Sequence, residues 1–302
     1  MATLILVLIF SSGIFKKQEI PEKPAPTISI GCDRVVWTET EEVLEASVEN
    51  IDKPAFEWKL SDINIGTGQK FSRKFEIGEN FISLNVSFNN QTISARKSIV
   101  VIDSVDGINI RESAASKNQW GFQTTFKGKN MGVKGMIIYV DALPPSEVNT
   151  CGAVSTKALY SGEHKWKAKY RNADIASGTF NIKKTSDLKI SRIEIAPGYT
   201  AGSVVKAKII LINTGSIDIT GFETRTFALN NDFAFMGDKA KREYSDKYNA
   251  KIKPGETYEI PIQMTIPEKV SGVRPAGRYT ITVDIFLGNK IVDTRVVNTQ
   301  VK

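Results

Sequence analysis

Residues 279–286 read YTITVDIF, and this stretch indicates the fold class most directly. Apolar and polar side chains alternate along it with a period of two, which is the pattern of a β-strand with one buried face. Residues 81–88, FISLNVSF, repeat the pattern, and residues 98–102, SIVVI, form a shorter apolar run. Turn-forming residues separate these runs, and helical apolar spacing is almost missing after residue 27. The sequence therefore predicts an all-β chain built of tandem β-sandwich modules.

The length and composition fit a protein of two or three ordinary globular domains. The chain has 302 residues, of which 41% are hydrophobic and 24% charged. The net charge of +7 is spread along the chain, whereas a nucleic-acid binder concentrates its excess in one stripe, so we expect no nucleic-acid partner. The densest basic run comprises Lys165, Lys167, Lys169 and Arg171, which alternate with apolar residues. This run predicts the solvated face of a strand, with an acidic-glycan-binding strip as the alternative.

The N-terminal segment predicts export from the cytoplasm. Residues 1–17 are interpreted as a signal peptide or a membrane anchor, because residues 2–15 are apolar and charge follows at Lys16 and Lys17. As a helix this run spans about 21 Å, less than the roughly 30 Å of a bilayer core. A leader truncated at its start and a core strand of an intracellular protein are the other readings. Residues 18–26 carry three prolines and predict a stiff spacer.

Residues 27–102 resemble the PKD-type immunoglobulin-like family of microbial surface proteins. The resemblance rests on FEWK at residues 56–59, the glycine loop at residues 66–68 and the run EIGENFISL at residues 76–84. It implies an immunoglobulin-like β-sandwich in which Trp58 fills the core. The loop after Trp58 lacks the Asp-Gly-rich turn of that family.

Residues 186–302 resemble the CARDB group, the cell-adhesion-related domains of bacteria and archaea. The matching residues include GSVVKAKI at residues 202–209, NTG at residues 213–215 and KPGET at residues 253–257. The resemblance implies a second immunoglobulin-like sandwich and a role in adhesion at a prokaryotic cell surface. Residues 103–185, between the two resemblances, predict a further β-sandwich of no recognised family.

An insertion at residues 230–249 departs from the CARDB pattern. It is longer and more charged than a hairpin connection, and we expect a short helix over residues 238–248. This insertion is also the expected contact surface for a partner. Its acidic residues Asp232, Asp238 and Asp246 are weak candidates for calcium ligands, since their spacing follows no known calcium loop.

Catalytic motifs are missing from the sequence, so we expect a protein that is not an enzyme. The single histidine, His164, rules out multi-histidine metal sites, and we expect it to be a hydrogen-bonded surface imidazole. The carboxylates Glu39, Glu41 and Glu42 are interpreted as a solvated strand edge rather than a hydrolytic pair. No phosphate-binding loop or nucleophile elbow occurs, and we expect no catalytic residue, bound metal or cofactor.

A few residues are candidates for modification, pairing or ligand contact. Asn85 and Asn90 begin N-glycosylation motifs, NVS and NQT. Trp120 and Trp166, together with Trp37, are candidate aromatics for stacking on a ligand, although core packing is the default for each. Cys32 and Cys151 fall in different predicted modules, so we favour two unpaired small side chains over a disulfide.

The leading hypothesis is a non-enzymatic extracellular or cell-surface protein with a structural or adhesive role. It would contact other surface proteins or cell-envelope glycans, and the membrane through an uncleaved leader. A carbohydrate-binding or accessory module of an extracellular enzyme is the first alternative. A subunit of a surface filament, with the leader packed in its core, is the second.

Overall fold

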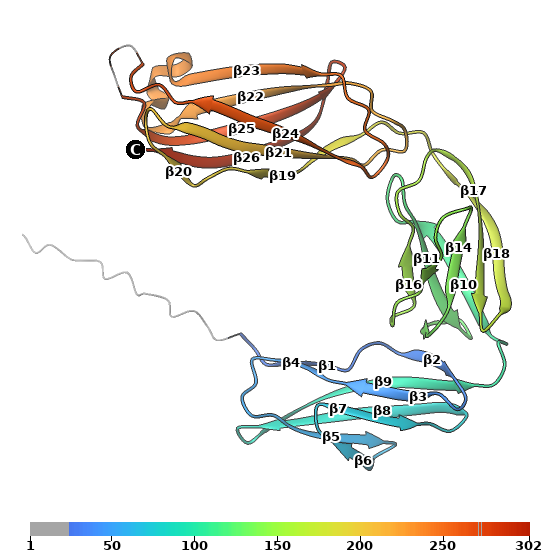
Figure 1. Ribbon diagram of the computed structural model, residues 1–302. Coiled ribbons are helices and arrows are strands. Elements are labelled where there is room, and N and C mark those ends of the chain that lie inside the picture. The colour runs from blue at the N-terminus through green and yellow to red at the C-terminus, as the bar shows by residue number, and fades with distance from the viewer. Residues whose placement is uncertain (1–23, 271, 273) are drawn as a thin grey trace, which may run out of the picture. The chain divides into compact units, whose positions relative to one another are not determined.

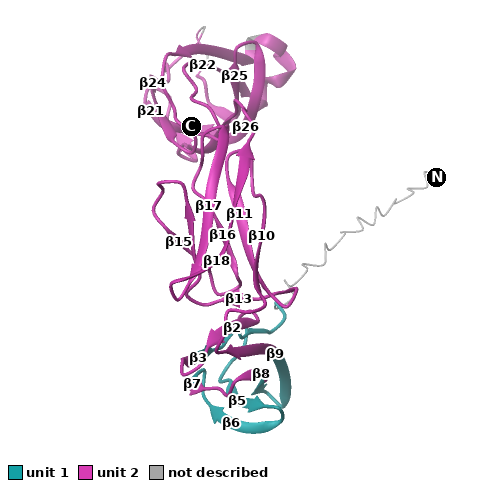
Figure 2. Cartoon of the chain, turned by 90° about the vertical axis from the view of Figure 1, so that its right-hand side faces the viewer, with its two compact units in different colours: residues 1–30, 43–72, 82–96 teal, residues 31–42, 73–81, 97–302 magenta. Residues whose placement is uncertain are grey.

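The computed structural model describes residues 24–270, 272 and 274–302, and these residues form an all-β protein (Figure 1). This confirms the predicted fold class. The leader and most of the spacer lie outside the described residues. The described residues divide into two compact units, the first comprising residues 24–30, 43–72 and 82–96, and the second comprising residues 31–42, 73–81 and those from 97 onward (Figure 2).

In the first unit, the strand that carries Trp58 pairs with a neighbour on each of its sides. Strand β5 (Ala55–Leu60) pairs with β6 (Ile63–Thr67) and with β8 (Gly78–Phe88), and β1 (Thr27–Ser29) pairs with β4 (Ser47–Glu49). Trp58 is fully buried, and its indole Nε1 donates a hydrogen bond of 2.8 Å to the Gly68 carbonyl oxygen. Strands β3 (Glu41–Glu45), β7 (Lys70–Lys74), β8 and β9 (Gln91–Ile102) each begin in one unit and end in the other.

The second unit begins with strand β2 (Arg34–Trp37), which lies in a parallel arrangement. On one side it pairs with the end of β9, and on the other with the short strand β13 (Gly132–Val133). Val35 of β2 and Val100 and Ile102 of β9 belong to the same hydrophobic core as the strands that follow.

The middle of the chain forms two sheets that share a hydrophobic core. One sheet contains β10 (Ile108–Ala114), β11 (Trp120–Phe126), β12 (Lys129–Asn130) and β16 (Ala153–Ser155). The other has the order β15 (Ser146–Glu147), β14 (Ile137–Val140), β17 (Gly162–Tyr170) and β18 (Ala173–Ile182). Phe122 of the first sheet meets Trp166 and Phe180 of the second, with ring centroids 5.1 and 6.2 Å apart. Aromatic pairs of this kind contribute both buried area and specific geometry to a core.

The C-terminal residues form another sandwich with its own core. A sheet of β19 (Leu188–Glu194), β21 (Val204–Asn213) and β24 (Thr257–Thr265) faces one of β20 (Gly198–Tyr199), β26 (Lys290–Val301), β25 (Gly277–Leu287), β22 (Phe222–Asn230) and β23 (Lys241–Tyr248). The stretch YTITVDIF lies in β25, where Val283 and Ile285 are buried as the alternation predicts. Phe286, on the opposite face from Ile285, is also buried, and the Arg225 guanidinium carbon lies 4.5 Å from the centre of its ring.

The helix expected over residues 238–248 is wrong in position. A 3-10 helix spans Asn231–Ala240, and Lys241–Tyr248 instead form the edge strand β23. Its residues pair one by one with β22, from Phe222 opposite Tyr248 to Leu229 opposite Lys241. An isolated helix of this length is marginally stable in water, whereas the pairing with β22 stabilises the strand, so the tertiary contact overrides the local preference.

Cys32 and Cys151 form a disulfide within the second unit, with Cα atoms 5.1 Å apart. The expectation of two unpaired side chains is therefore wrong. It assumed that the two predicted modules keep the cysteines apart. The parallel pairing of β2 with β13 brings residues 31–42 to the middle sandwich, and this places Cys32 next to Cys151.

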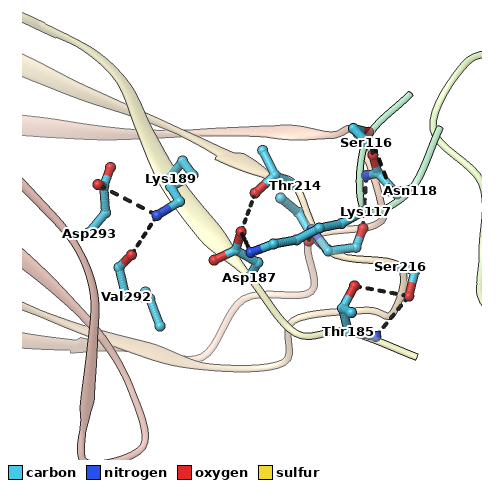
Figure 3. A network of polar contacts seen from close by, with 12 residues as sticks. Ser116, Lys117, Asn118, Thr185, Asp187, Lys189, Thr214, Ser216, Val292 and Asp293 are labelled. Carbon is cyan, nitrogen blue, oxygen red and sulfur yellow. Dashed lines mark hydrogen bonds and ion pairs between the residues drawn. The ribbon is translucent and has the colours of Figure 1, made fainter. Parts of the chain in front are cut away.

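A polar cluster joins residues of the middle and C-terminal sandwiches, and we call it the joint (Figure 3). Asn118, only 5% exposed, donates through Nδ2 to the Gly215 carbonyl oxygen at 2.8 Å. The Lys117 ammonium lies 2.6 Å from an Asp187 carboxylate oxygen, which also accepts from the Thr214 hydroxyl. The joint therefore satisfies its buried donors and acceptors with protein partners.

Candidate functional site

A solvent-facing groove of about 450 Å³ lies in the second unit. Its walls come from the end of β2, the turn after it, the segment from residue 134 to β14, and the hairpin between β17 and β18. Among the residues lining it are Trp37, Thr40, Lys134, Tyr139, Glu147, Lys169, Tyr170, Arg171 and Asn172. We call this cavity the groove.

Two aromatic residues, in contact with each other, form one wall of the groove. Trp37 ends β2, and its ring meets that of Tyr170 edge to face, with centroids 6.0 Å apart and an interplanar angle of 63°. Tyr170 is 2% exposed, and burial raises the pKa of its hydroxyl. Tyr139 is half-buried on the opposite face of β14 from the core residues Ile138 and Val140. Trp37 and Tyr139 thus present partly exposed rings to the groove.

Arg171 occupies an unusual backbone conformation at the rim. It forms, with Asn172, the two-residue turn between β17 and β18, and the φ angles are 46° and 70°. Positive φ at both central residues defines the hairpin turn that favours Asn and Gly, so an arginine in the first position is uncommon. The turn places the Arg171 guanidinium carbon 5.0 Å from the centre of the Trp37 ring. Within the described part of the chain, Arg171 has no ion pair.

A buried carboxylate lies behind the groove, which corrects the expectation that Glu39, Glu41 and Glu42 form one solvated edge. Glu42 is fully buried, and its oxygens lie 2.6 Å from Arg34 and 3.0 Å from Lys134. Alternation along β3 exposes Glu41 and turns Glu42 inward, where the two cations offset the cost of burying its charge.

The lysine residues of this region are less free than Arg171. Lys134 is bound to Glu42, and Lys169 lies 3.7 Å from Asp174, which Lys167 also contacts at 2.7 Å. These contacts, led by the hydrogen bond from Lys167, lower the pKa of Asp174. Burial lowers the pKa of Lys97 to about 8, and the charge of Arg34 acts in the same direction. Among the cations that line the groove, Arg171 is therefore the one most available to bind an anion from outside the chain.

The structure assigns core positions to the predicted ligand-contact aromatics. Trp166 is 7% exposed and packs over Gly178, where an added Cβ would lie 2.8 Å from the indole nitrogen. Its ring is therefore inside the sandwich rather than open to a ligand. Trp120 is half-buried and stacked on Phe180 with centroids 4.6 Å apart, and its Nε1 donates to Glu112. Ligand contact through the remaining face of Trp120 stays a prediction.

The two N-glycosylation candidates differ in access. Asn85 lies within β8, where its Nδ2 donates to Glu57 and its Oδ1 accepts from Ser94. Asn90 is exposed in the turn between β8 and β9 with a φ angle of 61°. The amide nitrogen of Asn90 is thus the more accessible of the two, and modification of either stays a prediction.

His164 is hydrogen-bonded, as expected, but only 11% of its side chain is exposed. Its Nδ1 lies 2.6 Å from an Asp141 carboxylate oxygen, and its Nε2 lies 2.9 Å from the Tyr160 carbonyl oxygen. Burial acts to raise the pKa of Asp141, but the hydrogen bonds from His164 and the Lys165 amide outweigh it and lower that pKa. His164 thus links the residue directly after β14 to the backbone before β17, and no nucleophilic side chain takes part in these contacts.

The expected candidates for metal ligation do not converge. In the described ranges, no three His, Cys, Asp or Glu side chains are placed to hold a metal ion. Asp232 instead accepts two hydrogen bonds from the Arg278 guanidinium, at 3.0 and 2.9 Å, while Asp238 lies near Lys241. No helix of the described part combines the length and the apolar character needed to cross a bilayer.

Sequence reasoning found part of the groove without recognising it. Trp37 was named as an aromatic candidate, and Lys169 and Arg171 as part of a basic run. Nothing in the sequence singles out Tyr139 or Lys134 as site residues, because they line the groove only through the pairing of β2 with β13. No local signal marks that parallel pairing of distant segments.

No protein-family model matches the chain, and no curated protein matches its sequence. Solved structures resemble it in part. A CARDB domain from Pyrococcus furiosus is 12% identical with a TM-score of 0.28, over 39% of this chain and 89% of that one. SGBP-B of the Bacteroides ovatus mixed-linkage glucan utilization locus, solved with a mixed-linkage heptasaccharide, is 13% identical with a TM-score of 0.24, over 93% and 71%. Such values assign the chain to no family and transfer no function to it.

Proposed function

We propose that this chain is a non-enzymatic protein of the cell surface or the secreted fraction, with a structural or adhesive role. The disulfide between Cys32 and Cys151 carries the proposal. Disulfides form and persist in oxidising compartments and are rare in a reducing cytosol. The apolar leader expected from the sequence agrees with that location.

The joint supports a structural role. Asn118 and Gly215, Lys117 and Asp187, and the Ser161 amide with the Ser216 carbonyl link the two sandwiches through short polar contacts. A linker without such contacts would leave adjacent domains free to move. Modules held in this way suit a spacer that presents a binding surface away from the cell.

The location is tested by thiol labelling during cell fractionation. Cells are lysed in the presence of a large maleimide reagent, with and without prior reduction, and the gel shift of the chain is followed in each fraction. We expect the chain in the envelope or the medium, with no shift before reduction and a double shift after it. The Cys151→Ser variant is the control and should shift once without reduction. A cytoplasmic chain that shifts twice without reduction contradicts the proposal.

A further inference from the structure

We propose that the groove binds a sugar ring that carries a carboxylate, as in an acidic, uronate-containing glycan. This inference goes beyond a structural or adhesive role, and it does not depend on where the protein is located. The groove's volume of about 450 Å³ falls within the usual range of small-ligand sites, roughly 300–1,000 Å³. None of the residues lining it belongs to the joint.

Arg171 supplies the recognition of the anion. Its guanidinium has no carboxylate partner in the described residues, and it is held over the Trp37 ring by the cation–π contact. The planar donor fork of arginine matches the two oxygens of a carboxylate.

The aromatic wall supplies a surface for the ring of the sugar. Tyr139 is half-buried, so it has ring area that a ligand would cover, whereas the Trp37 ring lies under the Arg171 guanidinium. A pyranose has a face of C–H groups, and burying it against an aromatic ring removes apolar surface from water. The polar side chains of Thr40, Glu147 and Asn172 lie along the same cavity and offer donors and acceptors for hydroxyl groups.

The charge balance favours one carboxylate per site over a densely charged ligand. Lys134 is already matched by Glu42 and Lys169 lies near Asp174, while Glu147 adds a negative charge to the lining. A nucleic acid or polyphosphate would need a row of unmatched cations. The groove has one such group, Arg171, so a singly charged sugar unit fits its electrostatics better.

The test is calorimetric titration of the full chain with matched hexasaccharides. The probes are β-1,4-linked hexamers of glucuronate and of glucose, which differ only in oxidation at C6, together with hexamers of galacturonate and mannuronate. We expect at least one uronate hexamer to bind, the glucose hexamer to bind roughly 10-fold or more weakly, and added salt to weaken uronate binding. At equal ionic strength, sulfate should weaken uronate binding no more than chloride does.

Substitutions connect the binding to the groove. Arg171→Gln should weaken uronate binding roughly 10- to 100-fold. Arg225→Gln is the matched control, since Arg225 lies 4.5 Å over the Phe286 ring but pairs with Glu223 and lines no part of the groove. Tyr139→Ala should weaken binding and Tyr139→Phe should restore it, while thermal melting checks that each variant is folded.

Several results would overturn the proposal. They are no binding of any uronate hexamer, equal binding of the glucose hexamer, a stronger loss of uronate binding in sulfate than in chloride of equal ionic strength, or equal losses in Arg171→Gln and Arg225→Gln. Each of these outcomes leaves the fractionation result for the proposed function unaffected, so the two proposals fail separately.

Discussion

The joint and the groove contain similar kinds of residue, yet they use them in opposite ways. At the joint, Asn118 is buried and its amide donates to a carbonyl, while Lys117 is matched with Asp187. In the groove, Arg171 is exposed and has no carboxylate partner in the described residues. This contrast indicates which cluster holds the structure together and which can bind a ligand. Matched and buried polar groups fix the structure, whereas unmatched and exposed ones at a cavity are free for a ligand.

The largest expected effect comes from the disulfide, which anchors β2 and with it the Trp37 wall of the groove. The cysteines are 119 residues apart in sequence, and the chain-entropy model gives about 5 kcal/mol for closing such a loop. The Cys32→Ser/Cys151→Ser variant should lose about 2–5 kcal/mol of unfolding free energy. Urea unfolding of the variant and the oxidised protein measures this difference. An unchanged midpoint would show that β2 is held without the crosslink.

The next effect tests whether the charge cluster behind the groove limits stability. The pKa of Lys97 is lowered from an ordinary 10.5 to about 8 by burial and by Arg34, against the opposing charges of Glu42 and Asp33. Between pH 8 and 10.5 the unfolded chain therefore binds more protons at this site than the folded chain does. Stability from this group should rise through that window, by roughly 2–3 kcal/mol.

Denaturant unfolding at a series of pH values measures the Lys97 effect. Other lysines and tyrosines titrate in the same range, so the Lys97→Met variant provides the baseline. The difference between the two proteins should shrink as the pH rises from 8 to 10. A constant difference across that window would mean that Lys97 is not strained by its burial.

Asn118 tests the joint directly. Asn118→Ala removes the donor to Gly215 and leaves that carbonyl oxygen buried without its partner, so we expect a loss of about 1–3 kcal/mol. Asn109→Ala is the control, because Asn109 is exposed in the same sandwich and should stay within about 0.5 kcal/mol of the wild type. Equal effects of the two changes, measured by urea unfolding, would show that the joint contributes no more than an exposed surface.

The sequence predicted the fold class well because alternation is a local signal. The run YTITVDIF became β25, and Trp58 became a buried core residue, since neither outcome depends on a distant partner. The basic run from Lys165 was likewise correct, with Trp166, Ala168 and Tyr170 buried and the lysines on the other face.

Three of the failures depend on contacts between distant segments. The disulfide, the burial of Glu42 and the assembly of the groove each follow from β2 joining the middle sandwich through β13. That pairing is parallel and links residues about a hundred positions apart, so no turn motif or residue spacing in the sequence predicts it. The sequence therefore shows which residue types are present, but it does not show that the residues of the groove lie close together in the fold.

The smallest expected change in stability is at Arg171, and it gives the sharpest contrast with the joint. Arg171→Asn places at a positive φ angle a residue that tolerates it, which should stabilise the turn by about 1 kcal/mol. The same change removes the cation–π contact with Trp37, worth about 0.5–1 kcal/mol at an exposed site. The two terms oppose each other, so urea unfolding should find the variant within about 0.5 kcal/mol of the wild type. A larger loss would make Arg171 a structural residue like Asn118, and the contrast between groove and joint would no longer hold.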